Sequence, residues 1–381
     1  MTEGLAPETD ARGTPTAVPT PEETGGGLRV LFDVGHPAQV HLFRNAIAEL
    51  RARGHETFVT SREKEVTTDL LDAYGVAHRS LSTRGDSVPG LAWELLVREW
   101  RLLGVARAFQ PDVIVARLGP GPAHVSALVG CRYVAVSDTR VGSRAIRALY
   151  RGATLPFVDT VCAPADFDLS VPDERRRTLD FQELAYLHPD RFDPDPAVLR
   201  EHGIDPEAPF SVVRVAGWDA YHDIGHAGIS PATLRALVDR LTDHGAVYVS
   251  AEGDLPPDLA AYRLPTDPED VHHVLAYADC YVGDSGTMST EAAMLGTPAI
   301  RTNTMVGDDD ENVFRALEER YGLMRSFSDE EAALSAVDDL LDSGIDRVDW
   351  AARRDRLVAE QPDVTAHIVE TVLESAPTPT P

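Results

Sequence analysis

A turn of small residues in the C-terminal half of the chain has the residue types that bind a diphosphate. The turn, residues 283–286, follows a short apolar run with strand composition and precedes a segment with the apolar spacing of a helix. A helix that begins directly after such a turn presents backbone N–H groups and the positive end of its dipole, which together attract anions. Ser285 and Thr287 add hydroxyl groups, and Gly286 lacks the side chain that would keep a diphosphate away. About one and a half turns later comes Glu291, whose carboxylate can accept two hydrogen bonds from ribose hydroxyls. The alternative is an ordinary strand, turn and well-capped helix.

The spacing of this motif resembles the donor-nucleotide signature of GT-B enzymes, especially that of the non-hydrolysing UDP-N-acetylglucosamine 2-epimerases. Their signature has Asp-Ser-Gly, a Glu six residues after the Ser, and then Leu-Gly-x-Pro; this chain has Asp284-Ser285-Gly286, Glu291 and Leu295-Gly296-Thr297-Pro298. Nearly the whole chain is also similar to a GT-B-like family of unknown function found mainly in prokaryotes. The resemblance implies an α/β fold of two doubly wound Rossmann-like domains with an interdomain cleft, and a C-terminal helix that crosses back to the first domain. It also implies a nucleotide-diphosphate sugar, UDP-linked, as the substrate.

The order of strand and helix patterns along the chain indicates the same fold class. Short apolar strands alternate with helices in two stretches, which predicts parallel, doubly wound sheets that bind ligands at the carboxyl ends of their strands. A proline-rich stretch between them marks a boundary. We expect a disordered tail at 1–27, domains at 28–185 and 210–345, a linker at 186–209, one long helix at 346–375 and a second tail at 376–381.

Four residues at the ends of predicted strands in the first domain are candidates for an acceptor site. Gly35 and His36 resemble the glycine-containing first loop of GT-B enzymes, and a histidine there can deprotonate an acceptor hydroxyl, or simply cap the helix that follows. Arg117 stands beside a glycine-rich turn, where it can bind a phosphate or carboxylate through two hydrogen bonds or belong to a rigid connector. Asp138 takes a place comparable to that of a Glu in the epimerases, so it can act as acid or base, or cap a helix.

One departure from the epimerase pattern bears on the reaction. The epimerases carry a catalytic Asp after the preceding strand, in a His-Gly-Asp run, and this chain has Ala116-Arg117-Leu118 there. Because no carboxylate replaces that Asp, the sequence disfavours epimerisation.

Three further residues of the second domain are candidates for contacts with the donor. In GT-B enzymes the loop after the first strand of this domain closes over the diphosphate, often with a basic residue; Arg214 fits this role, and Gly217 allows close approach of the backbone. Asn303 follows a later strand and is a candidate sugar contact. The acidic run 308–311 does not by itself define the geometry of a metal site, so we expect neither a metal nor a cofactor.

The composition limits the classes of partner. The chain has 62 acidic against 35 basic residues, a formal charge of −27, and Lys64 is its only lysine, a pattern that resembles proteins of extreme halophiles. So negative a chain is not expected to bind duplex nucleic acid. No apolar stretch approaches the ~20 residues of a membrane span, and no signal segment opens the chain, so we expect a soluble, cytoplasmic protein. The three cysteines lie far apart and are expected to pack as small core residues.

These observations favour a GT-B glycosyltransferase that uses a nucleotide-diphosphate sugar in the synthesis of a surface glycan or glycoconjugate. The catalytic candidates are His36 and Asp138. Two alternatives remain, a sugar-nucleotide epimerase and a non-catalytic protein that binds nucleotide sugars. The acceptor stays open between a glycan, a lipid carrier and a small molecule, and so does peripheral contact with a membrane.

Overall fold

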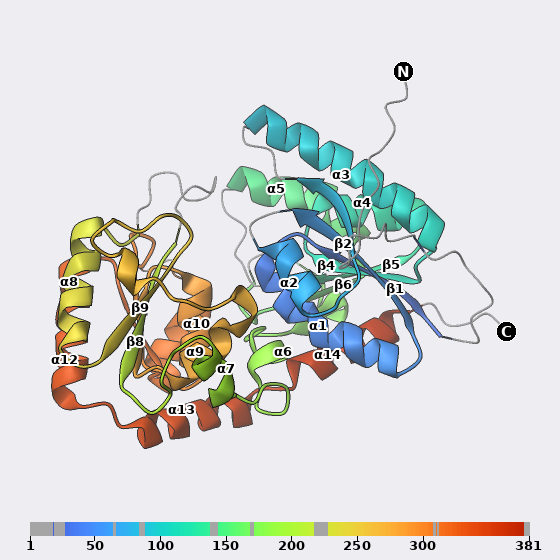
Figure 1. Ribbon diagram of the computed structural model, residues 1–381. Helices are drawn as coiled ribbons and strands as arrows, with labels where there is room; N and C mark the ends of the chain where they lie inside the picture. Colours follow the sequence, from blue (N-terminus) through green and yellow to red (C-terminus); the bar gives the residue numbers. More distant parts are fainter. Residues whose placement is uncertain are drawn as a thin grey trace. The chain divides into compact units, whose positions relative to one another are not determined.

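A computed structural model describes residues 18, 27–63, 66–83, 88–137, 144–167, 171–216, 228–307, 310 and 312–376. The chain divides into two compact units: unit 1 comprises Met1–Tyr186 and Asp363–Pro381, and unit 2 comprises Leu187–Pro362. Each unit is built on one parallel β-sheet with helices packed on it (Figure 1). The predicted fold class, with two doubly wound Rossmann-like domains, is therefore confirmed.

The sheet of unit 1 has seven strands among the described residues, in the order β3-β2-β1-β4-β5-β6-β7. Their bounds are β1 Arg29–Val34, β2 Glu56–Glu63, β3 Arg79–Thr83, β4 Val113–Arg117, β5 Arg132–Val136, β6 Thr160–Ala163 and β7 Arg176–Thr178. Successive residues of the central strands are buried, as in Val30–Phe32 and Val113–Val115, because helices cover both faces of a parallel sheet. The strand order reverses between β1 and β4, and ligands of open parallel sheets bind at such a reversal.

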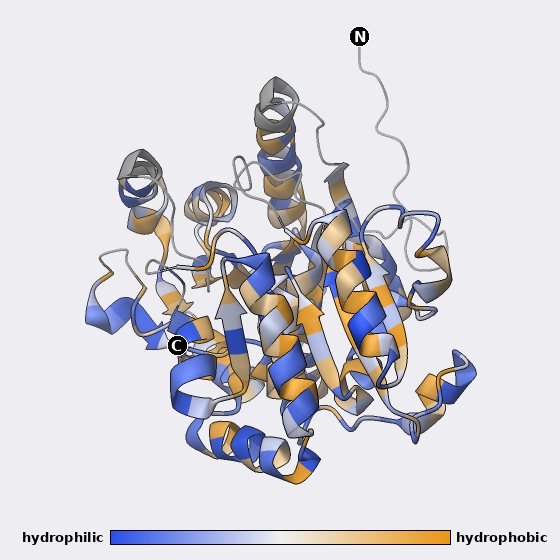
Figure 2. Ribbon diagram, turned by 90° about the vertical axis from the view of Figure 1, so that its left-hand side faces the viewer, coloured by the Kyte–Doolittle hydropathy of each residue, from blue (hydrophilic) through white to orange (hydrophobic). Residues whose placement is uncertain are grey.

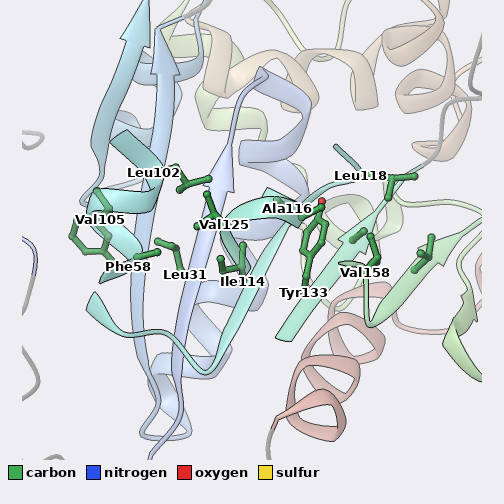
Figure 3. Packing of buried hydrophobic residues seen from close by; sticks show 14 of the residues in the cluster. Leu31, Phe58, Leu102, Val105, Ile114, Ala116, Leu118, Val125, Tyr133 and Val158 are labelled. Carbon is green, nitrogen blue, oxygen red and sulfur yellow. The ribbon is translucent and has the colours of Figure 1, made fainter. Parts of the chain in front are cut away.

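Seven α-helices accompany this sheet in the described part of the chain. They are α1 Pro37–Ala52, α2 Thr67–Ala73, α3 Val88–Phe109, α4 Pro120–Val129, α5 Arg144–Ala153, α6 Leu184–Leu187 and α14 Val364–Ser375. Leu102 and Val105 of α3 pack against Leu31 and Phe58 of the sheet in one fully buried cluster (Figure 3). On the C-terminal side, α14 packs against α1 and against the strands β4, β5 and β6.

The C-terminal segment differs from the sequence prediction of one long helix at 346–375. The structure has two helices instead, α13 (Arg347–Glu360) and α14. Pro362 lies between them and has no backbone N–H to continue a helix. Asp363 then caps α14, because its side chain accepts a hydrogen bond from the Ala366 N–H at 3.0 Å. The break is the point at which the chain returns to unit 1.

Unit 2 has a five-stranded parallel sheet among its described residues, in the order β12-β11-β10-β8-β9. Its strands are β8 Phe210–Val215, β9 Ala246–Ala251, β10 Cys280–Gly283, β11 Ala299–Thr302 and β12 Met324–Phe327. Its helices are α7 Pro196–Glu201, α8 Pro231–Thr242, α9 Val271–Tyr277, α10 Gly286–Met294, α11 Asn312–Arg315, a π-helical turn Ala316–Tyr321, α12 Glu330–Ser343 and α13. Orange strands beside helices of mixed colour show the apolar interior of the fold (Figure 2). The segment 187–209, expected as part of a linker, belongs to unit 2 and contains α7.

The cysteines are unpaired and pack as the sequence predicts. Cys162 and Cys280 are buried in strands, and Cys131 is partly buried. Burial raises the pKa of the Cys162 thiol to about 12 and that of the Cys280 thiol to about 11, so both stay protonated at neutral pH. None of the helices in the described part of the chain is long and apolar enough to cross a membrane.

We expect Tyr133→Phe to destabilise the protein although it removes only one oxygen atom. The buried Tyr133 hydroxyl donates to the Arg117 carbonyl at 2.7 Å and accepts from the Gly119 N–H at 3.3 Å. Loss of this oxygen leaves two backbone groups without their partner, which costs ~1–3 kcal/mol. The free energy of unfolding from urea denaturation measures this. The control is Tyr248→Phe, whose hydroxyl makes no hydrogen bond to the described residues; an equal effect of both substitutions would contradict the prediction.

Candidate functional site

The start of α10 brings together the small residues that the sequence singled out in unit 2. Helix α10 begins directly after β10, beside β8, where the strand order of this sheet reverses. Ser285 caps the helix, and its Oγ accepts a hydrogen bond from the Met288 N–H at 3.4 Å. The N–H groups of Gly286 and Thr287 lie in the first turn, where no preceding helical carbonyl can accept them. The geometry is that of an anion site at the carboxyl edge of a parallel sheet.

Asp284 fixes the surroundings of this helix start. Its side chain is buried, with Oδ1 accepting from the Ala216 N–H at 2.7 Å and Oδ2 from the Ile229 N–H at 3.0 Å. These two residues lie on either side of segment 217–227 in the sequence. Gly217 lies within the segment and outside the described residues.

Asn303 helps to hold the same turn. Its Nδ2 donates to the Asp284 carbonyl at 3.0 Å, and its Oδ1 accepts from the Met305 N–H at 2.9 Å. The sequence predicted a sugar contact for Asn303. In the structure both ends of its side-chain amide bind backbone groups of the two loops, and the sugar contact stays a prediction.

A side chain that the sequence analysis missed explains why residue 286 is a glycine. A Cβ at Gly286 would lie 2.9 Å from Cζ of Phe314, so the phenyl ring packs directly on the glycine. The guanidinium of Arg301 lies 3.7 Å from the centre of the same ring, and it is paired with Asp310. Asp310, one member of the acidic run 308–311, is thus the partner of a buried arginine. The other three residues of the run lie outside the described residues.

Glu291, the predicted ribose contact, lies in the interior of unit 2. Its side chain is buried, and its Oε1 lies 3.1 Å from Nε2 of His272, a buried residue of α9. One oxygen of the carboxylate thus lies against the imidazole ring. The spacing of the motif predicts a carboxylate on this helix. It does not predict which face of the helix is buried, so it does not predict that Glu291 points inward.

Arg214 is also paired in this structure. Its Nη1 donates to Ser250 Oγ at 2.9 Å, and its Nη2 pairs with Glu252. Arg214 stands next to Gly283 in the register of β8 and β10, close to the start of α10. Both terminal nitrogens of its guanidinium therefore have partners within unit 2.

A small cavity at the carboxyl edge of the sheet in unit 1 brings His36 and Arg117 together. Its volume is about 30 Å³, and Gln39, Val136 and Gln182 also line it. A cavity of this size holds a water molecule rather than a sugar. Gln39 also accepts a hydrogen bond from the Gly35 N–H at 2.7 Å, which fixes the loop after β1. The sequence alone does not single out either glutamine, because nothing in their local pattern distinguishes them from solvent-exposed polar residues.

His36 caps helix α1, and this fixes which ring nitrogen carries the proton. Its Nδ1 accepts a hydrogen bond from the Ala38 N–H at 3.2 Å. The neutral ring therefore has its proton on Nε2, which can donate a hydrogen bond but cannot take up a proton. The geometry favours His36 as a hydrogen-bond donor over the general base that the sequence suggested. Asp138, the other predicted catalytic residue, lies outside the described residues.

A buried ion pair holds the end of β1 next to this cavity. Asp33 accepts two hydrogen bonds from Arg98 of α3, both at 2.8 Å, and one from the Thr60 hydroxyl at 2.6 Å. Asp33 lies two residues before Gly35, so the pair positions the loop that carries His36. The sequence analysis did not single out Asp33, although a carboxylate near the end of a largely apolar strand is a signal that could have identified it.

Comparison with known proteins places the chain in a fold with two well-known activities. No family model matches the sequence. An uncharacterised protein of Methanocaldococcus jannaschii is 22% identical over 289 residues, which cover 72% of this chain and 81% of that protein. The structure of a UDP-GlcNAc 2-epimerase from Neisseria meningitidis bound to UDP-GlcNAc matches with a TM-score of 0.59 and 12% identity, over 91% of this chain and 100% of the epimerase. Spinosyn forosaminyltransferase matches with a TM-score of 0.60 and 20% identity, over 91% of this chain and 100% of the transferase. The chain has the fold that UDP-GlcNAc 2-epimerases share with GT-B glycosyltransferases.

We expect Arg98→Ala to reduce the free energy of unfolding by ~3–5 kcal/mol, because it leaves the buried Asp33 carboxylate without its cation. The double variant Asp33→Asn/Arg98→Ala removes that unpaired charge and should recover at least half of the loss. Chemical denaturation of the three proteins measures both effects. If the double variant is no more stable than Arg98→Ala, the loss comes from packing of the arginine and not from the buried charge.

Proposed function

We propose that the chain is an enzyme that transfers a sugar from a nucleotide-diphosphate donor, UDP-linked, to a hydroxyl group of an acceptor. The observation that carries the proposal is the start of α10, where Ser285 and the first N–H groups of the helix stand at the carboxyl edge of the unit 2 sheet. A fold shared with an epimerase that binds UDP-GlcNAc and with a glycosyltransferase supports the donor class.

In this proposal unit 2 binds the diphosphate of the donor. The N–H groups of Gly286 and Thr287 and the hydroxyl of Ser285 donate to phosphate oxygens, and the dipole of α10 stabilises the charge that grows on the diphosphate as it leaves. Arg214, which pairs with Glu252 in the structure, donates to a phosphate oxygen of the bound donor, because a guanidinium forms charge-assisted hydrogen bonds with phosphate as it does with carboxylate.

The transfer itself forms one bond and breaks one. The acceptor oxygen attacks the anomeric carbon of the sugar, the bond from that carbon to the diphosphate oxygen breaks, and the diphosphate leaves with the electron pair. The acceptor proton passes to Asp138, which we assign as the base from its place in the sequence. His36 donates a hydrogen bond from Nε2, as its capping geometry requires.

Epimerisation of a sugar nucleotide is the second candidate, supported by the motif that extends from Asp284 to Pro298. That reaction needs acid and base groups on both sides of one sugar carbon. The last residue of β4 is Arg117, and the buried Leu118 follows it. Neither residue carries a carboxylate. This difference favours transfer.

We expect Ser285→Ala to weaken binding of a UDP-sugar by roughly 10- to 100-fold, the effect of losing a hydrogen bond to a charged group. Asp329→Ala is the matched control, because Asp329 caps α12 of the same unit through the Ala332 N–H at 2.9 Å and has no part in the proposed site. Both variants lose a helix cap worth ~1 kcal/mol. Isothermal titration calorimetry with UDP-N-acetylglucosamine and other UDP-sugars measures the affinity; equal binding by Ser285→Ala and the wild type would refute the assignment.

Incubation with UDP-N-acetylglucosamine alone separates the two candidate reactions. A transferase leaves the sugar configuration of its donor unchanged when no acceptor is present, whereas an epimerase produces the 2-epimer. We expect proton NMR of the mixture to show no epimer above the level of a protein-free control. Appearance of the epimer at a rate proportional to protein concentration would contradict transfer as the main activity.

A further inference from the structure

The first half of α3 has its polarity reversed. A helix on the surface of a globular protein normally turns its charged residues to solvent and its apolar residues inward. Here Glu94 is buried and accepts a hydrogen bond from Arg62 Nε at 3.1 Å, and Arg98 is directed to the buried Asp33. The outward positions carry Trp93, Leu96 and Trp100, which are 69%, 63% and 68% exposed.

The second half of α3 holds the helix in this orientation. Leu102, Val105, Ala106 and Phe109 are buried in the core of unit 1, two of them visible in Figure 3. Rotation of the helix to hide its tryptophans would remove these residues from the core and break both inward ion pairs. The exposed apolar face is therefore a stable part of the fold.

The apolar surface continues onto the neighbouring elements. Glu99 of α3 lies 3.0 Å from Nδ1 of His124 on α4, and the His124 ring packs edge-on against Phe157, which is itself exposed. Leu128 is exposed one helical turn after His124. We call the set Trp93, Leu95, Leu96, Trp100, Leu128 and Phe157 the α3 patch. Large exposed apolar patches of this kind mark surfaces that bind a partner.

The charge around the α3 patch indicates which partner it fits. Residues 88–153 contain nine arginines and four acidic residues, a formal charge of +5, and counting their ion-pair partners outside this stretch (Asp33, Asp159 and Arg62) leaves +4, while the whole chain carries −27. Arg151 of α5 is exposed in this region. A helix with tryptophan and leucine on its outer face, next to arginines, is the pattern of a helix that lies in the interface of a bilayer with anionic headgroups. A second copy of the chain would instead bring two positively charged surfaces together.

We propose that the α3 patch binds the surface of an anionic lipid bilayer, so that unit 1 lies on a membrane without crossing it. The tryptophans and leucines enter the headgroup region, and the arginines contact lipid phosphates. This inference does not depend on the reaction proposed above, because it concerns a surface and not the two ligand sites.

Flotation of the full chain with vesicles tests the proposal. We expect the protein to float with vesicles that contain phosphatidylglycerol and to float at least about tenfold less with pure phosphatidylcholine, because the arginines need an anionic surface. The double variant Trp93→Gln/Trp100→Gln should bind anionic vesicles at least about tenfold more weakly, a change that corresponds to ~1.4 kcal/mol. The salt should be the lowest at which circular dichroism shows a folded protein, because salt screens the attraction of the arginines.

The matched control is Val348→Gln, which replaces the 79% exposed Val348 of α13 in unit 2 and should leave vesicle binding unchanged. Absence of wild-type flotation with anionic vesicles, or equal flotation of the tryptophan variant, overturns the proposal. Sedimentation velocity without lipid tests whether a second copy of the chain covers the α3 patch. A dimeric wild type together with a monomeric tryptophan variant would show that it does, and would also overturn the membrane proposal.

Discussion

The hydrogen bonds of Asp284 are the constraint on which the proposed donor site depends. One buried carboxylate accepts from Ala216 after β8 and from Ile229 before α8, while the carbonyl of the same residue accepts from Asn303 after β11. The carboxyl ends of three neighbouring strands are thereby tied to the turn that starts α10. The backbone N–H groups of that turn can bind an anion only because the turn has one fixed geometry, and fixed donors stabilise developing charge without the cost of reorganisation.

In unit 1 a buried carboxylate likewise fixes a loop, the one that follows β1. Asp33 is buried and paired with Arg98 of α3. This pair fixes the end of β1, from which the loop with His36 begins. The same pair turns the charged side of α3 inward and leaves Trp93 and Trp100 outside. One interaction thus positions the candidate acceptor loop and orients the apolar surface that we assign to a membrane.

The sequence predicts the fold because its signals are local, whereas much of the site depends on contacts between distant residues. Continuous apolar strands and the turn 283–286 can be recognised within a few positions, and Pro362 explains the helix break that the long apolar pattern concealed. The pairing of Glu291 with His272 and the ring of Phe314 on Gly286 join residues about 20 to 30 positions apart, and no local pattern encodes them. Likewise, the sequence permits His36 to be a base or a cap, and only the hydrogen bond to Ala38 assigns its tautomer.

A crystal structure with bound UDP would show directly where the donor binds. We expect its diphosphate oxygens to lie within hydrogen-bond distance of the N–H groups of Gly286 and Thr287, with Ser285 donating to one of them. A complex in which UDP binds elsewhere, while the turn that Asp284 holds remains without ligand, would contradict it.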